Sequence, residues 1–360
     1  MSGHRPTLQS VADRAQVSRQ TVSNAINSPE RLHPETLGRV RAAIESLRYR
    51  PHRAARSLRT RRSHLIGVRL MASGDGISGV VVDRFVHRLA EAADARGFRV
   101  VVFTAAEDRA EIEAYDDLLT TLDLDALVLT GTHHGDGRTD WLADRAVPFV
   151  TFGRPWGATA RHSWVDVDGA LGVQRVTADL IAAGQRRVAF LGWPQGSGVG
   201  DDRRSGWAAA MGAAAEPADG LSAQRLDGVD SGRDGMQTLL ASTSPPNAVV
   251  CASDSLALGA LQALEQAGRS AGPEFPVIGF DDTPVAAAVG LSSIAQPLRE
   301  SAAECLRLLT ALLDSARQRT PPARVLLEPT LVVRATGGVH PSTNRHPAVQ
   351  QRSHPRSSST

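Results

Sequence analysis

The residues best equipped for recognition chemistry lie near the start of the chain, where Arg19 and Gln20 are neighbours. A guanidinium can donate two hydrogen bonds to O6 and N7 of guanine, and a glutamine amide can pair in the same way with N6 and N7 of adenine. Both pairings require side chains that project from an element narrow enough to enter the major groove of DNA. The local sequence must supply that element.

Two short helices joined by a tight turn are expected around these residues. Apolar residues recur at i, i+3, i+4 and i+7 within 8–15, and Thr7 precedes them as an N-cap. After a turn at 16–17, Ser18 caps a second helix whose outward face carries Arg19, Gln20, Ser23 and Asn24. We expect three helices in this region, over 7–15, 19–26 and 34–48. The pattern predicts a helix-turn-helix of about fifty residues.

The charge of the chain is distributed unevenly. Residues 1–62 contain thirteen arginines against Asp13, Glu30, Glu35 and Glu45, a formal charge of +9. Because the whole chain carries +2, the remaining residues carry −7. A basic head on an acidic body indicates that the head meets a polyanion and the body does not.

Composition narrows the class of protein. The 360 residues are 42% hydrophobic and 22% charged, with no apolar run near the roughly 18–20 residues that a membrane-spanning helix needs. The start of the chain lacks the apolar region of a secretory signal, and Cys251 and Cys305 are too few and too distant for a disulfide framework. We therefore expect a globular protein of two or three folding units in the cytoplasm, associated with the nucleoid and without a membrane partner.

The first sixty residues resemble the lactose-repressor (LacI/GalR) family of bacterial transcription regulators. The resemblance rests on TLQSVADRAQVSRQTVSNAIN, followed by ETLGRVRAAIESLRYRPHRAARSL and HLIGV. It implies that Arg19, Gln20 and Asn24 contact base edges; many family members carry arginine in place of Asn24, so the base contacted there stays open. It implies phosphate contacts for Ser18, Thr21, Ser23 and Asn27. DNA contacts are also expected from Leu8, Arg53 and Ala55.

Residues 51–62 would then form the hinge helix of the family, which orders on DNA and inserts Leu58 into the minor groove. The segment is short, rich in arginine and lacks a wide apolar face, so folding coupled to DNA binding is physically reasonable. An exposed leucine among arginines is suited to unstack a base step. The alternative is a basic linker that carries an incidental leucine.

The body alternates short apolar runs with amphipathic stretches from His64 onward. Such runs predict parallel strands buried on both faces and connected by helices. Two sets of them predict an α/β body of two lobes, with a cleft at the carboxyl ends of the strands. The expected domains are a helix-turn-helix at 1–50, the hinge at 51–62, a two-lobed periplasmic-binding-protein-like (type I) body at 63–338 and a disordered tail at 339–360. Within the body we expect an N-lobe over about 63–160 and 293–322 and a C-lobe over about 161–292 and 323–338.

Three loops of the body also resemble the family, in RRSG, SDSLALG and GFDDT. The resemblance implies that Arg203, Ser253 and Asp281 bind a small effector, with serine in place of the commoner asparagine at 253. Arginine and aspartate together offer donors and acceptors to vicinal sugar hydroxyls. A mono- or oligosaccharide is the expected partner, with a purine or another co-repressor as the alternative.

Four tryptophans fall within about fifty residues, at positions 156, 164, 193 and 207. Large flat side chains at a cleft can stack on a pyranose ring. Trp193 follows an expected strand and is a candidate ligand contact. Trp207 is expected in the core, and packing between the lobes is the competing interpretation for Trp156 and Trp164.

The remaining motifs do not predict catalysis. The run GSGVG at 196–200 lacks the GK[ST] that follows a phosphate loop, and His133, His134 and Asp136 lack a further ligand for a metal site. No catalytic constellation stands out, so we expect neither an enzyme nor a cofactor or metal. The sequence therefore predicts a repressor that binds operator DNA as a homodimer under the control of a small ligand; a sugar-transport protein is the less favoured alternative.

Overall fold

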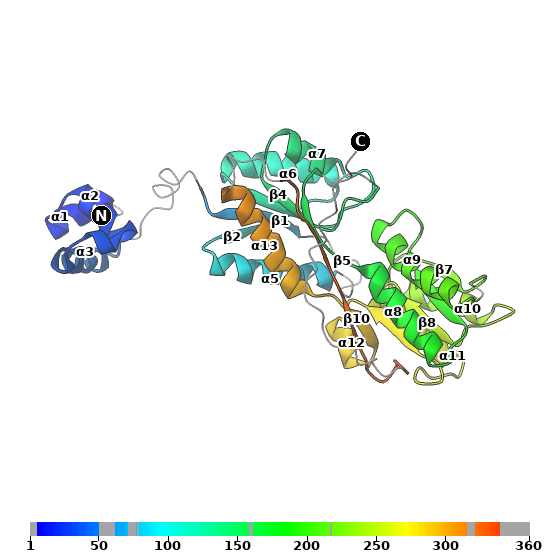
Figure 1. Cartoon of the computed structure of the whole chain (residues 1–360). Coiled ribbons are helices and arrows are strands. Elements are labelled where there is room, and N and C mark those ends of the chain that lie inside the picture. The colour runs from blue at the N-terminus through cyan, green and yellow to red at the C-terminus, as the bar shows by residue number, and fades with distance from the viewer. Residues whose placement is uncertain are drawn as a thin grey trace, which may run out of the picture. The chain divides into compact units, whose positions relative to one another are not determined.

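The chain divides into two compact units, Met1–His64 and Leu65–Thr360, each described by itself. The computed structural model describes residues 6–49, 62–70, 77, 79–157, 161–216, 218–314 and 321–338 (Figure 1). Within these ranges, no helix is both long and apolar enough to cross a membrane.

The first unit is a small bundle of helices. It contains α1 (Leu8–Ala15), α2 (Arg19–Asn27), the 3-10 helix η1 (Pro29–Arg31) and α3 (Pro34–Ser46). Thr7 and Ser10 form a capping box at the start of α1, and Gln16 ends that helix in the left-handed region, at φ 54°. Its core combines residues from all three α-helices: Val11, Ala12, Ala15, Val22, Val40, Ala43 and Tyr49. The three predicted helices are confirmed, with boundaries that differ by one or two residues.

The first sheet of the body is parallel throughout. Its strands are β1 (Leu65–Leu70), β2 (Arg99–Thr104), β3 (Ala126–Leu129), β4 (Phe149–Phe152), β5 (Ser163–Val167) and β11 (Arg324–Leu327), in the order β11-β5-β4-β3-β1-β2. In the register of the sheet, Ile66 of β1 lies between Val100 of β2 and Ala126 of β3. Helices α5 (Val80–Ala95) and α13 (Leu298–Asp314) pack together in one apolar cluster, and α6 (Asp108–Thr121) and α7 (Gly137–Asp144) contribute to a second one. We call this sheet with its helices the first lobe.

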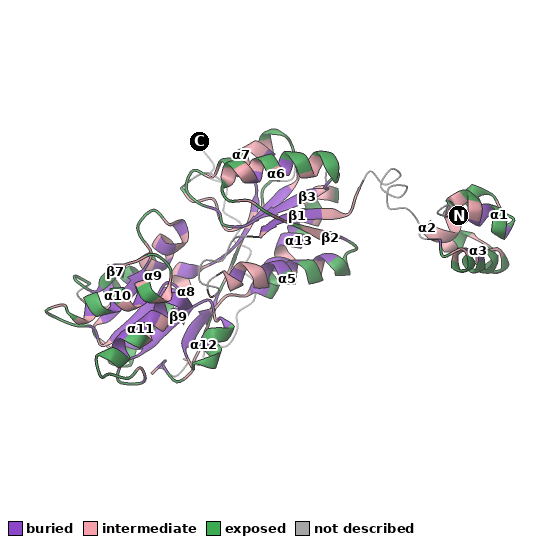
Figure 2. Cartoon of the chain, turned by 180° about the vertical axis from the view of Figure 1, so that it is seen from behind, coloured by how far each residue is buried: buried purple, intermediate pink, exposed green. Residues whose placement is uncertain are grey.

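The second sheet has the same winding and one antiparallel edge strand. Its strands are β6 (Val188–Gly192), β7 (Ser222–Gln224), β8 (Ala248–Cys251), β9 (Val277–Phe280), β10 (Ser292–Ala295) and β12 (Thr330–Val332), in the order β12-β10-β9-β8-β6-β7. Its helices are α8 (Gly169–Ala182), α9 (Gly198–Ala213), α10 (Val229–Leu240), α11 (Asp254–Gln266) and α12 (Pro284–Ala288). Only β12 runs antiparallel to its neighbour. This second lobe has one continuous core, and the buried strands contrast with the exposed outer faces of the helices (Figure 2).

The chain crosses between the lobes at places other than the expected ones. β5 pairs with β4 in the first sheet, so the first crossing follows Val167 rather than residue 160. β10 belongs to the second sheet, so the next crossing falls at 296–297 rather than near 293. β11 pairs with β5 in the first sheet, and the last crossing lies between Leu327 and Thr330. The strand before each crossing still belongs to the sheet of the lobe that the chain leaves, and such short strands lack a strong apolar signal.

Helix α9 also begins earlier than the sequence indicates. Ser197 caps a helix that starts at Gly198 by accepting a hydrogen bond from the Gly200 amide. Glycines normally disfavour a helix, which concealed this first turn. Here they allow close contact, because a Cβ at Gly198 would lie 2.3 Å from the indole of Trp156.

Candidate functional site

The second helix of the head is positioned by its cap. The Ser18 hydroxyl accepts a hydrogen bond from the Thr21 amide at 3.1 Å and lies 2.9 Å from the Thr21 hydroxyl. These bonds fix the first turn of α2, which leaves Arg19 and Gln20 exposed. A surface hollow follows this turn and is lined by Leu8, Gln9, Val17, Ser18, Arg19, Gln20 and Ser23. Five of the predicted DNA-contacting residues therefore share one face.

Two predicted base-contacting residues are coupled on this face. The Gln20 Nε2 donates a hydrogen bond to the Asn24 Oδ1 at 3.1 Å, one helical turn along α2. The bond orients the Gln20 amide and occupies one of its donors. Pairing with adenine would use the remaining donor and the carbonyl oxygen of the same amide.

Other predicted DNA contacts have different outcomes. Leu8 packs partly against the core of the head, so its side chain has a structural role as well as a place beside the hollow. Asn27 ends α2, and its side chain is outside the description. Arg53, Ala55 and Leu58 lie outside the described residues, as does the expected hinge apart from Arg62.

The second lobe brings Arg203 and Asp281 together, as the sequence predicts. Arg203 lies on α9 and Asp281 follows β9; their Nη2 and Oδ1 atoms are 3.6 Å apart. The Arg203 Nη1 also donates to the carbonyl oxygen of Ala252 at 2.5 Å, and its guanidinium lies 3.6 Å from the ring centroid of Phe280. Gln296, in a crossing segment, donates to the Asp281 Oδ1 at 2.7 Å. Gln296 was not predicted, because it is remote in sequence and carries no motif.

Burial dominates the electrostatics of this pair. Asp281 is 5% exposed, and burial raises the pKa of its carboxyl to about 7, while Arg203 acts in the opposite direction. Burial also lowers the pKa of Arg203. Four carboxylates oppose that second effect: Asp281, Asp227, Asp166 and Asp202. No hydrogen-bond partner for the buried Arg203 Nε is present in the described part of the chain. The pair can thus offer both a donor and a titratable acceptor to a ligand.

Ser253 is engaged as a helix cap. Its hydroxyl accepts from the Leu256 amide at 3.2 Å and donates to the Asp227 Oδ1 at 2.5 Å. Ser253 is fully buried at the start of α11. Asp227, which follows β7, was not predicted because the weak strand before it gave little indication of a loop at the sheet edge.

The tryptophans occupy distinct environments. Trp193 follows β6, and the Arg203 guanidinium lies 5.3 Å from its ring centroid. Trp156 follows β4 in the first lobe and contacts Gly198 of the second lobe. The indole N–H groups of Trp156, Trp164 and Trp193 are buried and have no acceptor among the described residues. Trp207 is in the core, as predicted, and donates to the carbonyl oxygen of Val188 at 2.9 Å.

Arg154 links the two lobes near Trp156. It follows β4 and donates from Nε to Asp166 at 2.5 Å. Its Nη1 lies 3.4 Å from the Oδ1 of Asp202, on α9 of the second lobe. The Arg154 guanidinium is 4.9 Å from the ring centroid of Trp156. Arg154 and Trp156 therefore contact the same first turns of α9.

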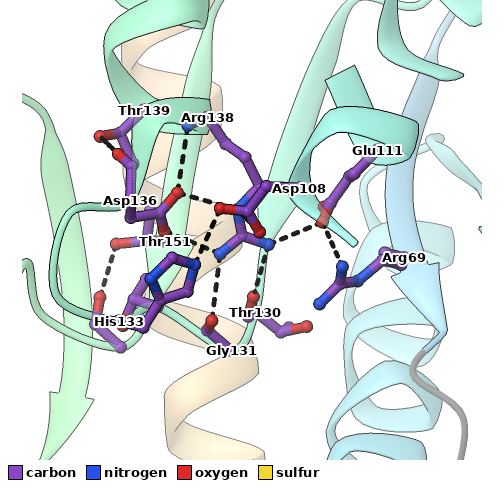
Figure 3. Close-up of polar contacts among 12 residues, drawn as sticks. Arg69, Asp108, Glu111, Thr130, Gly131, His133, Asp136, Arg138, Thr139 and Thr151 are labelled. Carbon is purple, nitrogen blue, oxygen red and sulfur yellow. Dashed lines mark hydrogen bonds and ion pairs between the residues drawn. The ribbon is translucent and has the colours of Figure 1, made fainter. Parts of the chain in front are cut away.

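A buried ionic network covers the carboxyl edge of the first sheet (Figure 3). Arg138, on α7, is fully buried and bonds Glu111 and Asp136 at 2.7 Å each. Arg69, near the end of β1, contacts the same Glu111 at 2.6 Å. The network joins α6 and α7 to the carboxyl edge of the first sheet.

His133 and Asp136, which the sequence brings together as possible metal ligands, lie at the margin of this network. Possible ligand atoms of Asp108, His133 and Asp136 lie within 4.8 Å of one another. The Asp136 carboxylate already binds Arg138, whose Nε also lies 3.5 Å from Asp108. His133 lies 2.9 Å from Asp108. The buried guanidinium accounts for this grouping of acidic side chains.

Comparisons with known proteins match both units. Residues 7–52 match the family described as bacterial regulatory proteins, lacI family, and residues 177–336 match a periplasmic binding protein-like domain. The HTH-type transcriptional regulator CelR of Thermobifida fusca is 34% identical over 343 residues, which cover 92% of this chain and 98% of CelR. The chain belongs to the LacI family.

Other LacI-family proteins are similar over nearly the whole length. The HTH-type transcriptional regulator AglR of Rhizobium meliloti (strain 1021) is 30% identical, covering 94% of this chain and 96% of AglR. A solved CelR–cellobiose complex has a TM-score of 0.68 at 31% identity, covering 92% of this chain and all of that one. The lac repressor dimer bound to operator and the anti-inducer ONPF has a TM-score of 0.80 at 25% identity, covering 93% of this chain and 99% of that one. This LacI-family chain is accordingly a DNA-binding transcriptional regulator and not an enzyme.

Proposed function

We propose that this regulator represses transcription by binding an operator, and that a neutral disaccharide or short oligosaccharide between the lobes controls its affinity for DNA. The observation that carries the proposal is the contact of Arg203 with Asp281, extended by Gln296, beside the carboxyl end of β9. Ligands of open parallel sheets bind at such strand ends. A guanidinium, a carboxylate and an amide together can bond several hydroxyl groups.

The charge of the cleft favours a neutral ligand. Four carboxylates act on Arg203, and Arg154 is already shared between Asp166 and Asp202. A phosphorylated sugar would add a charge of about −1.5 to −2, which these carboxylates would repel. Cellobiose, the ligand of the related CelR structure, is neutral, and indoles such as Trp193 suit the apolar face of a pyranose. Cellobiose is therefore the first ligand to test.

The DNA contacts form the second part of the proposal. Arg19, Gln20 and Asn24 contact bases, while Ser18, Thr21, Ser23 and Asn27 contact phosphates. The hinge, with Arg53, Ala55 and Leu58, orders in the minor groove. Exposure of Arg19 and Gln20 beside the hollow of the head supports this assignment. Two chains bind a pseudo-palindromic site as a homodimer, as in the lac repressor dimer on its operator, and the complex acts on nucleoid DNA in the cytoplasm.

The primary test is a titration of operator binding with candidate ligands. The full chain is mixed with DNA from upstream of its own gene, and fluorescence anisotropy is recorded with cellobiose, cellotriose, maltose, glucose, cellobiose 6-phosphate or guanine. We expect cellobiose or cellotriose to release the DNA and the phosphorylated sugar to have no effect. Tighter binding with any compound would identify a co-repressor and reverse the proposed sign. Absence of DNA binding would contradict the assignment of the head.

Arg203→Gln tests the cleft in the same assay. We expect the variant to bind operator within about threefold of wild type and to lose the response to sugar, because allosteric coupling requires a ligand that prefers one state. Arg204→Gln, at the next position along α9, is the matched control. A sugar response that persists in Arg203→Gln would show that the ligand binds elsewhere.

A further inference from the structure

One hydrogen bond joins helix α5 of the first lobe to the loop that carries Asp281. The Nη1 of Arg84 donates to the main-chain oxygen of Asp282 at 2.8 Å, across 198 positions of sequence. Arg84 is partly buried, so water screens this charged donor less than it screens a donor on an exposed side chain. The acceptor is a main-chain oxygen, and the bond therefore reports the position of the backbone after β9.

The loop after β9 has a strained backbone. Asp281 and Asp282 both lie in the left-handed region, at φ 110° and 50°. Non-glycine residues in such conformations are energetically unfavourable and persist where the surroundings determine them. The structure therefore needs bonds that hold this loop.

Those bonds come mostly from the second lobe. The Asp282 amide donates to the Ser293 hydroxyl at 2.9 Å, and the Thr283 amide donates to the Asp254 carboxylate at 2.7 Å. The Ser293 hydroxyl in turn donates to the same Asp254 carboxylate at 2.6 Å. The Asp282 carboxylate lies 2.6 Å from Arg334. These bonds hold residues 281–283 as one unit against the second lobe, and Arg84 is the contact of this unit with α5.

The two ends of this unit face different partners. The Asp281 side chain contacts Arg203 and Gln296, while the next residue, Asp282, accepts the bond from Arg84. A ligand that displaces Asp281 would therefore also displace Asp282, which accepts the bond from Arg84. α5 packs with α13 in the core of the first lobe, so a displacement of Arg84 would be transmitted to that core.

We propose that Arg84 is a positioning residue that couples ligand binding at Asp281 to helix α5, and thereby to operator affinity. The inference rests on the proposed function for the identity of the ligand. The hydrogen bond between Arg84 and Asp282 is present whatever that ligand is. Removing the donor leaves the ligand groups and the DNA-contacting groups in place. The expected consequence is that both ligands still bind and that their mutual effect is lost.

The test compares three variants of the full chain. Arg84→Met removes the donors and retains a long side chain, and Arg84→Lys retains one charged donor. Arg88→Met is the matched control, because Arg88 lies one turn along the same helix and pairs with exposed Glu91 at 2.9 Å. For each variant, operator affinity is measured with and without saturating cellobiose, and cellobiose affinity is measured by calorimetry. The coupling factor is the ratio of the two operator affinities.

We expect the coupling factor of Arg84→Met to fall below about a third of the wild-type value, which for allosteric proteins is typically about 5- to 150-fold. Both separate affinities should stay near wild type, Arg88→Met should couple normally, and Arg84→Lys should recover part of the coupling. Wild-type coupling in Arg84→Met would overturn the proposal. A loss of cellobiose affinity equal to the loss of coupling would also overturn it, because the residue would then act on binding alone.

A second measurement separates this proposal from the identity of the ligand. If cellobiose leaves wild-type operator affinity unchanged, the proposed ligand is wrong. The role of Arg84 is then tested by hydrogen–deuterium exchange of the ligand-free proteins. Hydrogen–deuterium exchange of a peptide spanning 278–284 should be faster in Arg84→Met than in wild type or Arg88→Met, because the loop has lost its bond to α5. Equal exchange in all three proteins would overturn the role of Arg84.

Discussion

Arg203 and Asp281 form a buried contact in which the guanidinium and the carboxylate do not approach closely: the Arg203 Nη2 and Asp281 Oδ1 atoms are 3.6 Å apart. Because this separation exceeds that of a good charge-assisted hydrogen bond, the contact only partly offsets the cost of burying the carboxylate. The consequence is a carboxyl group whose pKa is raised to about 7. A ligand hydroxyl that reaches Asp281 would complete the bonding that the protein leaves unfinished.

Sugar binding should therefore depend on pH. Below pH 7 the ligand-free Asp281 holds its proton, because its pKa lies above that of an ordinary carboxyl. A sugar hydroxyl that donates to Asp281 favours the ionised form, so binding should release a proton and become tighter as the pH rises from about 6 to 8. His162 does not titrate in this range, because burial lowers its pKa to about 4.

Calorimetry in two buffers with different enthalpies of ionisation measures this proton release. Asp281→Asn is the control, since it retains hydrogen-bonding groups and cannot titrate. We expect Asp281→Asn to bind sugar without proton release. Proton uptake by the wild type, or pH dependence that survives in Asp281→Asn, would assign the titration to another group.

Replacement of Arg19 should relax the sequence preference at one operator position. The residue is exposed at the start of α2, beside the Ser18 cap. A bidentate contact to guanine is worth roughly 1–3 kcal/mol of discrimination, and Arg19→Ala should lose it. Competition binding against single-base operator variants gives the preference at each position. An equal loss of affinity for every sequence would indicate a phosphate contact instead.

Gly198→Ala should disturb the contact between the lobes. Its new Cβ would lie 2.3 Å from the Trp156 indole, so the ring must move. We expect the midpoint of thermal unfolding to fall, and Trp156→Ala to remove most of the additional loss in the double variant, with a coupling of about 0.5–3 kcal/mol. Gly212→Ala is the matched control on the same helix, because nothing lies within 4 Å of its Cβ position. Additive effects of the two changes would exclude the clash as the cause.

Arg138→Met should destabilise the body strongly. The change leaves the buried carboxylates of Glu111 and Asp136 without their shared cation, and breaking a buried pair in this way costs about 3–5 kcal/mol. The free energy of unfolding in urea is the measurement. Arg145→Met is the control: its guanidinium lies 4.0 Å from the Trp141 ring centroid at an exposed site, a contact worth about 0.5–1 kcal/mol. Similar losses in both variants would contradict the special role of the buried network.

The local sequence determined the helices of the head and most elements of the two lobes. Residues 8–15 place their apolar side chains at helical spacing, and Ser18 stands where a helix must begin, so neighbours along the chain suffice to predict α1 and α2. The buried runs of β3 and β8 likewise contain only apolar or small side chains, and β1 adds only Arg69 to such a run. Family resemblance added Arg203 and Asp281, which the structure brings together.

The tertiary structure alone decided which sheet each short strand joins and which residues, remote in sequence, complete the candidate ligand site and the contact with α5. β5 and β11 are short strands whose place depends on the sheet that they join, and no local pattern specifies that pairing. Gln296, Asp227 and Arg84 reach their partners from 15, 26 and 198 positions away. Such contacts arise from the way in which strands and crossings fold back on one another. They are long-range consequences of packing, and periodicity within a short window carries no information about them.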